Sequence, residues 1–458
     1  MPRPPFFLVT LTHPLWDAAL ACAGALPGEA LPELRLDLFP ERDAASLVRD
    51  LEGHCLATCR RGSEGGGWPD ADEAARLERL RAAVEAGAAW VDLEWELEVP
   101  EWIQARRGGL GLLRSVHVAP GVFDFEARLA ALPEGDALKW VGHAERLGDN
   151  ARAAEYCAMA TDRGLAASCF LMGPKGIPSR CLQRKWGGAF TYAAPDDGPP
   201  AAPGQLTLAA MREWGVDRAG PATVLFAVAG APVLHSRSPA YHNRRFREAG
   251  QDALYLALES GDAAEVEEAL GRLDFRGLSI TAPLKESLPA RLGLAGPLNT
   301  LWREGGAWKG ANTDAEAVDA ALRDLPPGPV LVLGSGGVAE TSRAVAEARG
   351  RVARIASRRD PVSPEEIRSL APVGVLQATS LGMEGGDPLP FPELLDAARP
   401  SLAWAVEWIY KEDTAFAAWA REAGLALVAG AALFEAQAEA QARRFLTGPG
   451  GSGPRHGS

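Results

Sequence analysis

The sequence TVLFAVAGAPVLHSRSPAYHN, residues 223–243, decides how the chain is divided. It opens with a nearly continuous apolar run, which predicts a buried strand. A polar cluster with Ser236 and Ser238 follows, and Pro239 is well placed to start a helix. Two hydroxyls at the exit of a buried strand can both face a small polyol or carboxylate, or one of them can simply cap the helix. The residues before this stretch repeat one architecture, and those after it follow another.

Length and composition indicate a multidomain globular protein. The 458 residues suffice for roughly two to four domains, and 47% hydrophobic and 23% charged residues are ordinary values. The formal charge of −13 argues against nucleic acid or an anionic membrane surface as the main partner. No apolar run reaches the ~18 residues of a membrane span. His13, Pro14 and Asp17 interrupt the apolar N-terminus, so we expect a first strand and helix rather than a signal peptide.

The cysteines favour a reducing compartment. All six precede residue 223, none forms a CxxC pair, and no histidine spacing suggests a zinc site. We therefore expect free thiols, no bound metal and a cytoplasmic location. The tail 449–458 is rich in Gly, Ser and Pro and is predicted to be disordered.

From residue 6 to about 215, short apolar strands alternate with amphipathic helical stretches, clearest at 73–86, 125–132 and 151–163. This alternation predicts a (β/α)8 barrel in residues 1–218, with catalytic groups at the C-terminal ends of its strands. The candidate strands are 6–11, 34–39, 55–59, 90–94, 112–118, 137–141, 167–172 and 189–192.

Polar residues gather where these strands end. Glu33, Arg35 and Asp37 alternate, which places them on one face of a strand. Lys139 lies in the apolar strand DALKWVG, an unfavourable place for an ammonium group unless it is neutral or paired. His117 ends the neighbouring strand, and a buried lysine beside a histidine is an arrangement used in Schiff-base chemistry. Taken singly, Lys139 could instead form a salt bridge and His117 could be a core histidine.

Further polar residues complete a family pattern. Arg60 and Glu64 precede the glycines 65–67, Arg180 ends GIPSR, and Gln205 ends APGQ. Together with ELRLD, TCRRGSEGG and SVH, these motifs make residues 6–215 resemble a type I 3-dehydroquinate dehydratase. Ala201 replaces the usual serine of the last motif, which removes one hydroxyl contact.

The resemblance implies roles for these residues. Lys139 would form an imine with the ring ketone of 3-dehydroquinate, and His117 would remove the adjacent proton and deliver it to the departing hydroxyl. Glu64 would assist from the opposing loop, and Arg180 would bind the substrate carboxylate as a bidentate fork. The residues implied to hold the ring hydroxyls are Glu33, Arg35, Arg60 and Gln205.

After residue 223, PVLVLGSGGVAETSRAVAEARG (329–350) predicts a strand, a glycine turn and a helix, an arrangement that can bind a pyrophosphate. The second strand ends in ARIASRRD, where an acidic residue would favour NAD. Ser357, Arg358 and Arg359 suit a 2′-phosphate instead, so we expect NADP(H), although the two arginines could be merely solvated.

Further candidate site residues lie between these segments, in FRGLSITAPLKESL (275–288) and in the LNT and GANTD motifs. Thr281 and Lys285 bracket a proline, which predicts that the lysine leaves a constrained turn rather than a free surface helix. Asn299 and Asp314 supply an amide and a carboxylate on nearby loops. A Lys–Asp pair can relay a proton to an alcohol oxygen during hydride transfer. A surface ion pair is the alternative.

These motifs, with SRSP, QATSLGM and GAALFEAQAEAQ, make residues 222–448 resemble a shikimate dehydrogenase. The resemblance implies a substrate domain at 222–320, a Rossmann domain at 321–429, and a last helix at 430–448 that packs back on the substrate domain. Lys285 and Asp314 would carry the proton. The residues implied to bind the ring are Ser236, Ser238, Thr281, Asn299, Asp314, Tyr410 and Gln437. Those implied for the cofactor are Gly334, Ser335, Gly336, Gly337, Val338, Ala339, Ser357, Arg358, Arg359, Thr379 and Gly430.

Two departures from the usual pattern accompany this resemblance: Gln377 in place of an asparagine and Glu407 in place of an aspartate. Ser279 stands where many monofunctional members have asparagine, but plant-type fused members often carry serine there. The combined prediction is a fused enzyme that dehydrates 3-dehydroquinate and then reduces 3-dehydroshikimate to shikimate with NADPH. Two alternatives stay open: a quinate/shikimate catabolic enzyme and a non-catalytic quinate-sensing regulator. The four residues Lys139, His117, Lys285 and Asp314 argue against the regulator.

Overall fold

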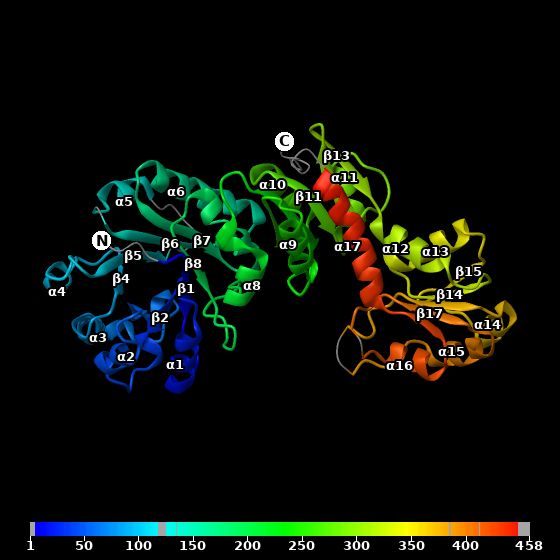
Figure 1. Cartoon of the computed structure of the whole chain (residues 1–458), viewed down its shortest axis with the longest axis horizontal. Coiled ribbons are helices and arrows are strands. Elements are labelled where there is room, and N and C mark those ends of the chain that lie inside the picture. Colours follow the sequence, from blue (N-terminus) through cyan, green and yellow to red (C-terminus); the bar gives the residue numbers. More distant parts are fainter. Residues whose placement is uncertain (1–4, 118–124, 134, 384–385, 412, 448–458) are drawn as a thin grey trace, which may run out of the picture. The chain divides into compact units, whose positions relative to one another are not determined.

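The computed structural model describes residues 5–117, 125–133, 135–383, 386–411 and 413–447. The tail 449–458, predicted to be disordered, lies outside the described residues. The chain divides into two compact units, Met1–Arg276 and Gly277–Ser458 (Figure 1). Within the described residues, no helix is both long and apolar enough to cross a membrane.

Unit 1 begins with eight parallel strands in the order β7-β6-β5-β4-β3-β2-β1-β8. Between β7 and β8 the described residues form no ladder, but the N–H of Ala189 donates to the carbonyl of Ala167 (2.8 Å) and Ser168 Oγ donates to that of Phe190 (2.7 Å). The predicted barrel is thus confirmed in a nearly closed form. Its strands are β1 (Phe7–Thr10), β2 (Ala30–Arg35), β3 (Leu56–Thr58), β4 (Trp90–Glu94), β5 (Gly111–His117), β6 (Ala137–His143), β7 (Ala166–Met172) and β8 (Thr191–Ala193).

The helices that follow these strands include the three that periodicity predicted most clearly, α3, α5 and α6, each within about one residue of its expected bounds. They are α1 (Trp16–Ala25), α2 (Ala44–Asp50), α3 (Glu73–Glu85), α4 (Glu101–Gln104), α5 (Phe125–Ala131), α6 (Asn150–Asp162), α7 (Ile177–Cys181) and α8 (Leu208–Trp214). Short 3₁₀ turns that carry loop residues are η1 (Leu36–Leu38), η2 (Gly62–Glu64), η4 (Leu147–Asp149) and η5 (Pro174–Gly176).

The second strand was predicted at 34–39, and this was wrong. The strand is β2, and Asp37 lies beyond it in η1. Pro32 pairs with Val9 inside the strand although proline lacks a backbone donor, so the strand begins earlier than expected. Glu33 and Arg35 therefore lie on the strand as expected, whereas Asp37 reaches the site from a turn.

Apolar side chains fill the space on both sides of the strands. An inner cluster contains Leu8, Leu56, Trp90 and Phe190, and closes the barrel interior. Outer clusters lie between the strands and the helices, for example Leu80 of α3 against Leu93 of β4. This packing leaves the C-terminal ends of the strands for polar residues.

The rest of unit 1 contains β9 (Val224–Gly230), α9 (Ser238–Glu248), β10 (Ala253–Glu259) and α10 (Ala263–Arg272), with β9 and β10 paired in parallel. Pro239 lies in the first turn of α9, as predicted. Arg237 occupies the N-cap position, so neither serine is the N-cap residue of this helix. Ser236 Oγ instead accepts a hydrogen bond from the backbone N–H of Ser238 at 3.2 Å.

Unit 2 opens with an antiparallel arrangement of β11 (Phe275–Ile280), β12 (Thr300–Glu304) and β13 (Ala307–Ala311). Lys285 lies in the first turn of α11 (Leu284–Arg291), directly after Pro283. The expectation that the lysine leaves a turn instead of a helix was therefore wrong, because α11 begins immediately after the proline.

A five-stranded parallel sheet, in the order β15-β14-β16-β17-β18, confirms the predicted Rossmann-type fold. Figure 1 shows α12 and α13 on one face of this sheet and α14 to α16 on the other. Its strands are β14 (Val330–Leu333), β15 (Ala353–Ala356), β16 (Gly374–Gln377), β17 (Trp404–Glu407) and β18 (Ala426–Val428). The helices are α12 (Thr313–Arg323), α13 (Gly337–Ala348), α14 (Pro364–Leu370), α15 (Pro392–Ala398), α16 (Ala415–Glu422) and α17 (Gly430–Thr447).

Candidate active sites

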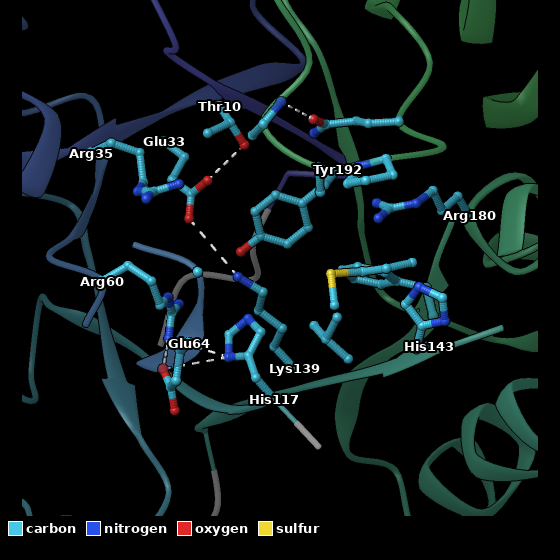
Figure 2. Close-up of a pocket in the computed structure, with 18 of the residues that line it drawn as sticks. Thr10, Glu33, Arg35, Arg60, Glu64, His117, Lys139, His143, Arg180 and Tyr192 are labelled. Atoms are coloured by element: carbon cyan, nitrogen blue, oxygen red, sulfur yellow. Dashed lines mark hydrogen bonds and ion pairs between the residues drawn. The ribbon is translucent and has the colours of Figure 1, made fainter. Parts of the chain in front are cut away.

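A cavity of about 560 Å³ opens at the C-terminal ends of the barrel strands (Figure 2). All eight polar residues proposed from the sequence for this half line it. They are Glu33, Arg35, Arg60, Glu64, His117, Lys139, Arg180 and Gln205. Because these residues come from six different strands or the loops that follow them, only the closure of the barrel brings them together.

Lys139 projects from β6 into this cavity and is 6% exposed. Its Nζ lies 3.5 Å from Asp92 Oδ2, 3.9 Å from Glu33 Oε1 and 4.2 Å from the centroid of the Tyr192 ring. Burial lowers the pKa of Lys139, although Asp92 and Glu33 act in the opposite direction. A lysine with a lowered pKa provides more neutral amine at neutral pH, and neutral amine is the form that attacks a carbonyl.

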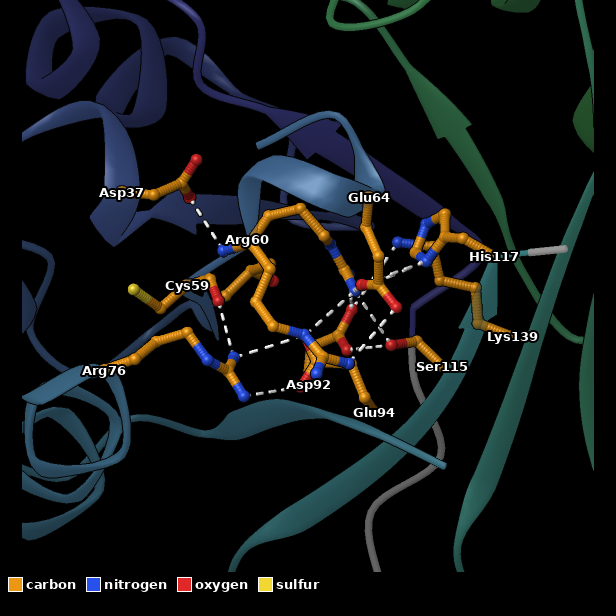
Figure 3. A network of polar contacts seen from close by, with 12 residues as sticks. Asp37, Cys59, Arg60, Glu64, Arg76, Asp92, Glu94, Ser115, His117 and Lys139 are labelled. Carbon is orange, nitrogen blue, oxygen red and sulfur yellow. Dashed lines mark hydrogen bonds and ion pairs between the residues drawn. The ribbon is translucent and has the colours of Figure 1, made fainter. Parts of the chain in front are cut away.

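A buried network of charges lies beneath this lysine (Figure 3). Arg60 donates to Asp92 (2.6 Å) and Glu94 (3.3 Å), and Arg76 pairs with Glu94 at 2.9 Å. Burial acts to raise the pKa of Asp92, but Arg60 and then Lys139 lower it below the usual value. Asp92 is therefore a fixed negative charge that faces Lys139 and favours a cation at Nζ.

The loop that carries Glu64 is held in place by a carboxylate. Asp37 accepts hydrogen bonds from the backbone N–H groups of Arg60 (3.1 Å) and Gly67 (2.9 Å), and also pairs with Arg35 at 2.6 Å. Adding a Cβ at Gly66 would place it 2.1 Å from the carbonyl oxygen of Arg60, so this position requires glycine. The run of glycines is therefore a folded part of the site and not a plain flexible loop.

His117 ends β5 on the same side of the cavity. Its Nδ1 lies 3.6 Å from Glu64 Oε2 and 3.4 Å from Arg60 Nη1. Burial, and then the positive charges of Arg60 and Lys139, keep the pKa of His117 well below 6.5. The imidazole is consequently neutral at neutral pH and can accept a proton.

Arg180, in α7, is 1% exposed and lies with its guanidinium 4.7 Å from the centroid of the Phe170 ring. Burial lowers the pKa of Arg180 to about 10. In the described part of the chain no carboxylate pairs with it, and its Nε has no hydrogen-bond partner. A buried, unpaired guanidinium that lines a cavity is able to bind a carboxylate supplied from outside.

Several residues of this cavity were not predicted. Tyr192 packs on Lys139 with a buried hydroxyl that has no partner among the described residues, and His143 and Thr10 also line the cavity. Thr10 ends a strand that was correctly predicted, which was the available signal, whereas Asp92 lies in the middle of β4, and its position in the strand gave no such signal. Gln205 is positioned by a hydrogen bond from the backbone N–H of Ala201 to its Oε1 at 2.8 Å.

His13, Cys22 and Asp197 also meet, with one potential metal-ligand atom from each within 4.8 Å of the others. Spacing along the sequence could not indicate this group, because Asp197 follows β8 whereas His13 follows β1 and Cys22 lies in α1. Burial, with the charge of Asp197, raises the pKa of the Cys22 thiol to about 11. A thiol with this pKa is protonated and is a poor metal ligand. All six cysteines are free.

In unit 2, Lys285 Nζ donates to Asp314 Oδ2 at 2.6 Å, and Asp314 is 7% exposed. The pair joins α11 to α12, and its burial distinguishes it from a solvated surface ion pair. The structure therefore brings together the two residues that were expected to carry the proton.

A network of amide side chains reaches Thr313, the residue before Asp314. Asn299 Oδ1 accepts hydrogen bonds from the N–H of Thr313 (2.8 Å) and from Thr300 Oγ1 (2.9 Å). Gln441 of α17 donates to Gln437 Oε1 at 2.7 Å and to Thr313 Oγ1 at 3.3 Å. Gln441 also accepts from Ser279 Oγ at 2.9 Å, so the serine in place of asparagine is integrated into the network. Gln441 was not predicted as a site residue, although its motif had been singled out.

The nucleotide turn fits a pyrophosphate. Gly334 has φ 131°, and a Cβ there would lie 2.7 Å from the carbonyl oxygen of Ala378. A Cβ at Gly336 or Gly337 would meet no atom within 4 Å, which leaves open space at the N-terminus of α13. Val338 and Ala339 continue the helix, and Ala339 is buried in the core; Ser335 precedes it in the exposed turn.

The end of β15 fits a 2′-phosphate. Ser357 Oγ accepts hydrogen bonds from the N–H groups of Arg359 (3.2 Å) and Asp360 (2.9 Å), which shape the turn. The Asp360 carboxylate pairs with Arg354 at 2.7 Å. Arg358 and Arg359 are exposed and have no acidic partner in the described residues, so both remain able to bind an anion.

Tyr410 and Gly430 also lie together. The Tyr410 ring is 5.7 Å from that of Phe434, and a Cβ at Gly430 would lie 2.1 Å from the carbonyl oxygen of Ile409. Glycine at position 430 is thus required by the close approach of α17 to the segment after β17.

The two substitutions in this half each have a local partner. Gln377 Oε1 accepts from the N–H of Thr379 at 2.7 Å, and this holds the turn after β16. Glu407 accepts from Thr414 Oγ1 at 2.8 Å, and burial raises the pKa of Glu407 to about 7. Of the other predicted residues, Thr281 accepts from the N–H of Leu284 through its carbonyl.

Ser236 and Ser238 belong to unit 1, whereas Thr281, Asn299, Lys285, Asp314 and Gln437 belong to unit 2. Ser238 is 6% exposed at the start of α9.

Comparison with known proteins finds a similar family for each of the two regions that contain these candidate sites. Residues 7–214 match the family model of type I 3-dehydroquinase, and residues 228–294 match that of the shikimate dehydrogenase substrate binding domain. The first half of the chain is therefore similar to type I 3-dehydroquinases, and part of the second half is similar to the substrate binding domain of shikimate dehydrogenases.

A curated relative carries both domains. The chloroplastic bifunctional 3-dehydroquinate dehydratase/shikimate dehydrogenase of Arabidopsis thaliana is 29% identical over 371 residues, which cover 72% of this chain and 61% of that protein. This chain therefore spans less than two thirds of that relative's length.

Two solved structures are also similar. The dehydroquinate dehydratase and shikimate dehydrogenase of S. pombe AroM covers 98% of this chain, with 96% of its own length covered, 23% identity and a TM-score of 0.40. The shikimate 5-dehydrogenase of Thermus thermophilus, solved with NADP(H) and shikimate, covers 49% of this chain, with 94% of its own length covered, 29% identity and a TM-score of 0.41.

Proposed function

We propose that this chain dehydrates 3-dehydroquinate to 3-dehydroshikimate in its barrel and reduces that product to shikimate with NADPH in its second half. The observation that carries the proposal is a single cavity with a buried lysine of lowered pKa, a neutral histidine and an unpaired buried arginine. These groups supply a nucleophile, a base and a carboxylate-binding site for one small substrate.

In the barrel, Arg180 holds the substrate carboxylate, and the ring ketone reacts with Lys139 Nζ to form an imine with loss of water. The protonated imine withdraws electrons from the neighbouring carbon, so that His117 can remove its proton. The C–O bond to the next carbon then breaks, and His117 returns its proton to the departing hydroxyl. Hydrolysis of the imine releases the conjugated product and regenerates the amine. Asp92 stabilises the cationic imine, and Glu64 orients His117.

In the second half, NADPH supplies a hydride to the carbonyl carbon of 3-dehydroshikimate when it is bound. Lys285 holds a proton at Nζ for the carbonyl oxygen, and Asp314 orients this lysine through their hydrogen bond of 2.6 Å. Ser236, Ser238, Thr281, Asn299, Tyr410 and Gln437 are the residues that we assign to the ring. Gly336, Gly337, Arg358 and Arg359 would hold the phosphates of the cofactor.

We assign 1–218 to the dehydratase, 222–320 to the substrate domain, 321–429 to the nucleotide domain and 430–448 to the helix that returns to the substrate domain. The matches at 7–214 and 228–294 support the first two. Six free cysteines support a cytoplasmic location. The net charge of −13 supports small molecules rather than nucleic acid as partners, and the reaction that we propose uses no metal.

Oxidation of NADPH with 3-dehydroquinate as the only organic substrate tests the proposal. We expect oxidation by the wild type, its loss in Lys139→Ala, and its recovery in that variant when 3-dehydroshikimate is added. If neither substrate supports oxidation by the wild type, the proposal is wrong. The same assay with quinate and NAD then tests the catabolic alternative.

A further inference from the structure

One carboxylate from beyond residue 218 is buried against loops of the barrel. Glu265, in the first turn of α10, is 3% exposed. Its oxygens accept hydrogen bonds from the N–H of Leu147 (2.7 Å), from Lys175 Nζ (2.9 Å) and from Ser260 Oγ (2.6 Å). Burial acts to raise the pKa of Glu265, but these three hydrogen bonds lower it below the usual value. Glu265 is thus a charged carboxylate, and both of its oxygens accept hydrogen bonds.

The two barrel partners of Glu265 belong to the loops that follow β6 and β7. A buried amide, Asn150, joins these loops: its Nδ2 donates to the carbonyl oxygens of Leu147 and Lys175, both at 2.8 Å. Its Oδ1 accepts from the backbone N–H of Ser179 at 3.0 Å. Ser179 directly precedes Arg180 in α7. A path of hydrogen bonds therefore leads from α10 to the backbone of Ser179, the residue before the arginine that faces the cavity.

The loop and the helix approach each other closely. A Cβ at Gly148 would lie 2.8 Å from Glu268 Oε1, so the barrel loop carries no side chain where α10 packs. Glu268 also pairs with Arg146 at 3.0 Å, but both side chains are exposed. An exposed pair of this kind contributes little, whereas the buried Glu265 holds its partners in one geometry.

We propose that Glu265 is a positioning residue of the dehydratase site, supplied by the dehydrogenase half of the chain. It fixes the loops at Leu147 and Lys175, and through Asn150 it fixes the backbone that aims Arg180 at the substrate carboxylate. The inference rests on the proposed dehydratase function. It makes substrate binding in the barrel depend on a residue outside the barrel, while Lys139 and His117, on β6 and β5, keep their own contacts.

Steady-state kinetics of the full-length chain test this role. Glu265→Gln keeps an acceptor for Leu147 but removes the charge that faces Lys175, and Glu265→Ala removes all three hydrogen bonds. We expect the KM for 3-dehydroquinate to rise about 3-fold in the first variant and about 10-fold or more in the second, with kcat within about 2-fold. The matched control on the same helix, Glu268→Gln, should change neither constant, since its ion pair is exposed.

Two further measurements separate positioning from a general loss of structure. The KM and kcat for 3-dehydroshikimate with NADPH should stay within about 2-fold in Glu265→Gln. Lys175→Met should raise the dehydratase KM as Glu265→Gln does, and the double variant should be no worse than the worse single one, because both remove the same interaction. These milder variants carry the test if Glu265→Ala does not fold.

An unchanged KM in Glu265→Ala, equal losses in both activities, or additive effects in the double variant would overturn the inference. A wild type without dehydratase activity would overturn the proposed function as well. An active wild type with unaffected variants would overturn this inference alone.

Discussion

Replacing Arg180 by methionine should remove substrate binding without weakening the fold. Burial lowers the pKa of Arg180 from 12.5 to about 10. At about 1.4 kcal/mol for each pKa unit, the folded protein holds this charge at a cost of about 3 kcal/mol. This charge destabilises the folded state because a base whose pKa is lower in the folded protein is protonated more favourably in the unfolded chain. Arg180→Met should therefore leave the free energy of unfolding unchanged or raise it by up to about 3 kcal/mol, after some loss of packing on Phe170.

The same substitution removes the partner of the substrate carboxylate. A buried, charge-assisted bidentate contact is worth about 3–4 kcal/mol, so the KM for 3-dehydroquinate should rise roughly 100- to 1000-fold. The assays are the ultraviolet absorbance of the conjugated product and unfolding in urea. Arg184→Met is the matched control, because Arg184 lies on the Phe6 ring at an exposed position outside the cavity. A small change in KM, or a loss of stability large enough to account for lost activity, would refute the reasoning.

Four other predictions follow from the two sites. Because the pKa of His117 is well below 6.5, the dehydratase rate should stay constant as pH falls to 6.5 and should decline only at a pH well below that value. Below pH 6.5 the unfolded chain protonates His117 before the folded protein does, which destabilises the fold; His117→Gln should therefore lose less stability than the wild type in this range, as measured by urea titration. Glu407→Gln should raise the free energy of unfolding by about 1–3 kcal/mol above pH 7, where burial penalises the charged carboxylate, and the gain should vanish near pH 4.5. Arg358→Ala with Arg359→Ala should raise the KM for NADPH about 10- to 100-fold and leave that for NADH unchanged, and equal effects on both would exclude a 2′-phosphate site. Asp314→Asn should lower the kcat for 3-dehydroshikimate about 100-fold while dehydratase activity persists, and an unchanged kcat would remove the Lys285–Asp314 pair from the mechanism.

Local patterns predicted most of the barrel. Continuous apolar runs marked the strands because both faces of a parallel sheet are buried, and β4 was placed to the residue. The error at β2 arose because Pro32, which disfavours a strand, is tolerated where its missing donor is not needed.

The residues that we assign to the substrate could be predicted because they lie at strand ends or in the loops that follow them, but the residues that alter their pKa values could not. Asp92 and Tyr192 act on Lys139 from other strands, and their importance depends on distances of 3.5 and 4.2 Å that only the closed barrel defines. Glu265 is more extreme: its partner Leu147 is 118 residues away in the sequence. A glutamate in an amphipathic helix ordinarily predicts a solvated face, and its burial depends entirely on tertiary packing.

The most direct test of the account is reduction of the enzyme–substrate mixture with sodium borohydride, followed by mass analysis of peptides. We predict that 3-dehydroquinate or 3-dehydroshikimate leaves a reduced adduct on the peptide that contains Lys139, and that Lys139→Ala carries none. An active wild type that is not trapped, or is trapped only on another lysine, would contradict the assignment of Lys139 as the Schiff-base residue.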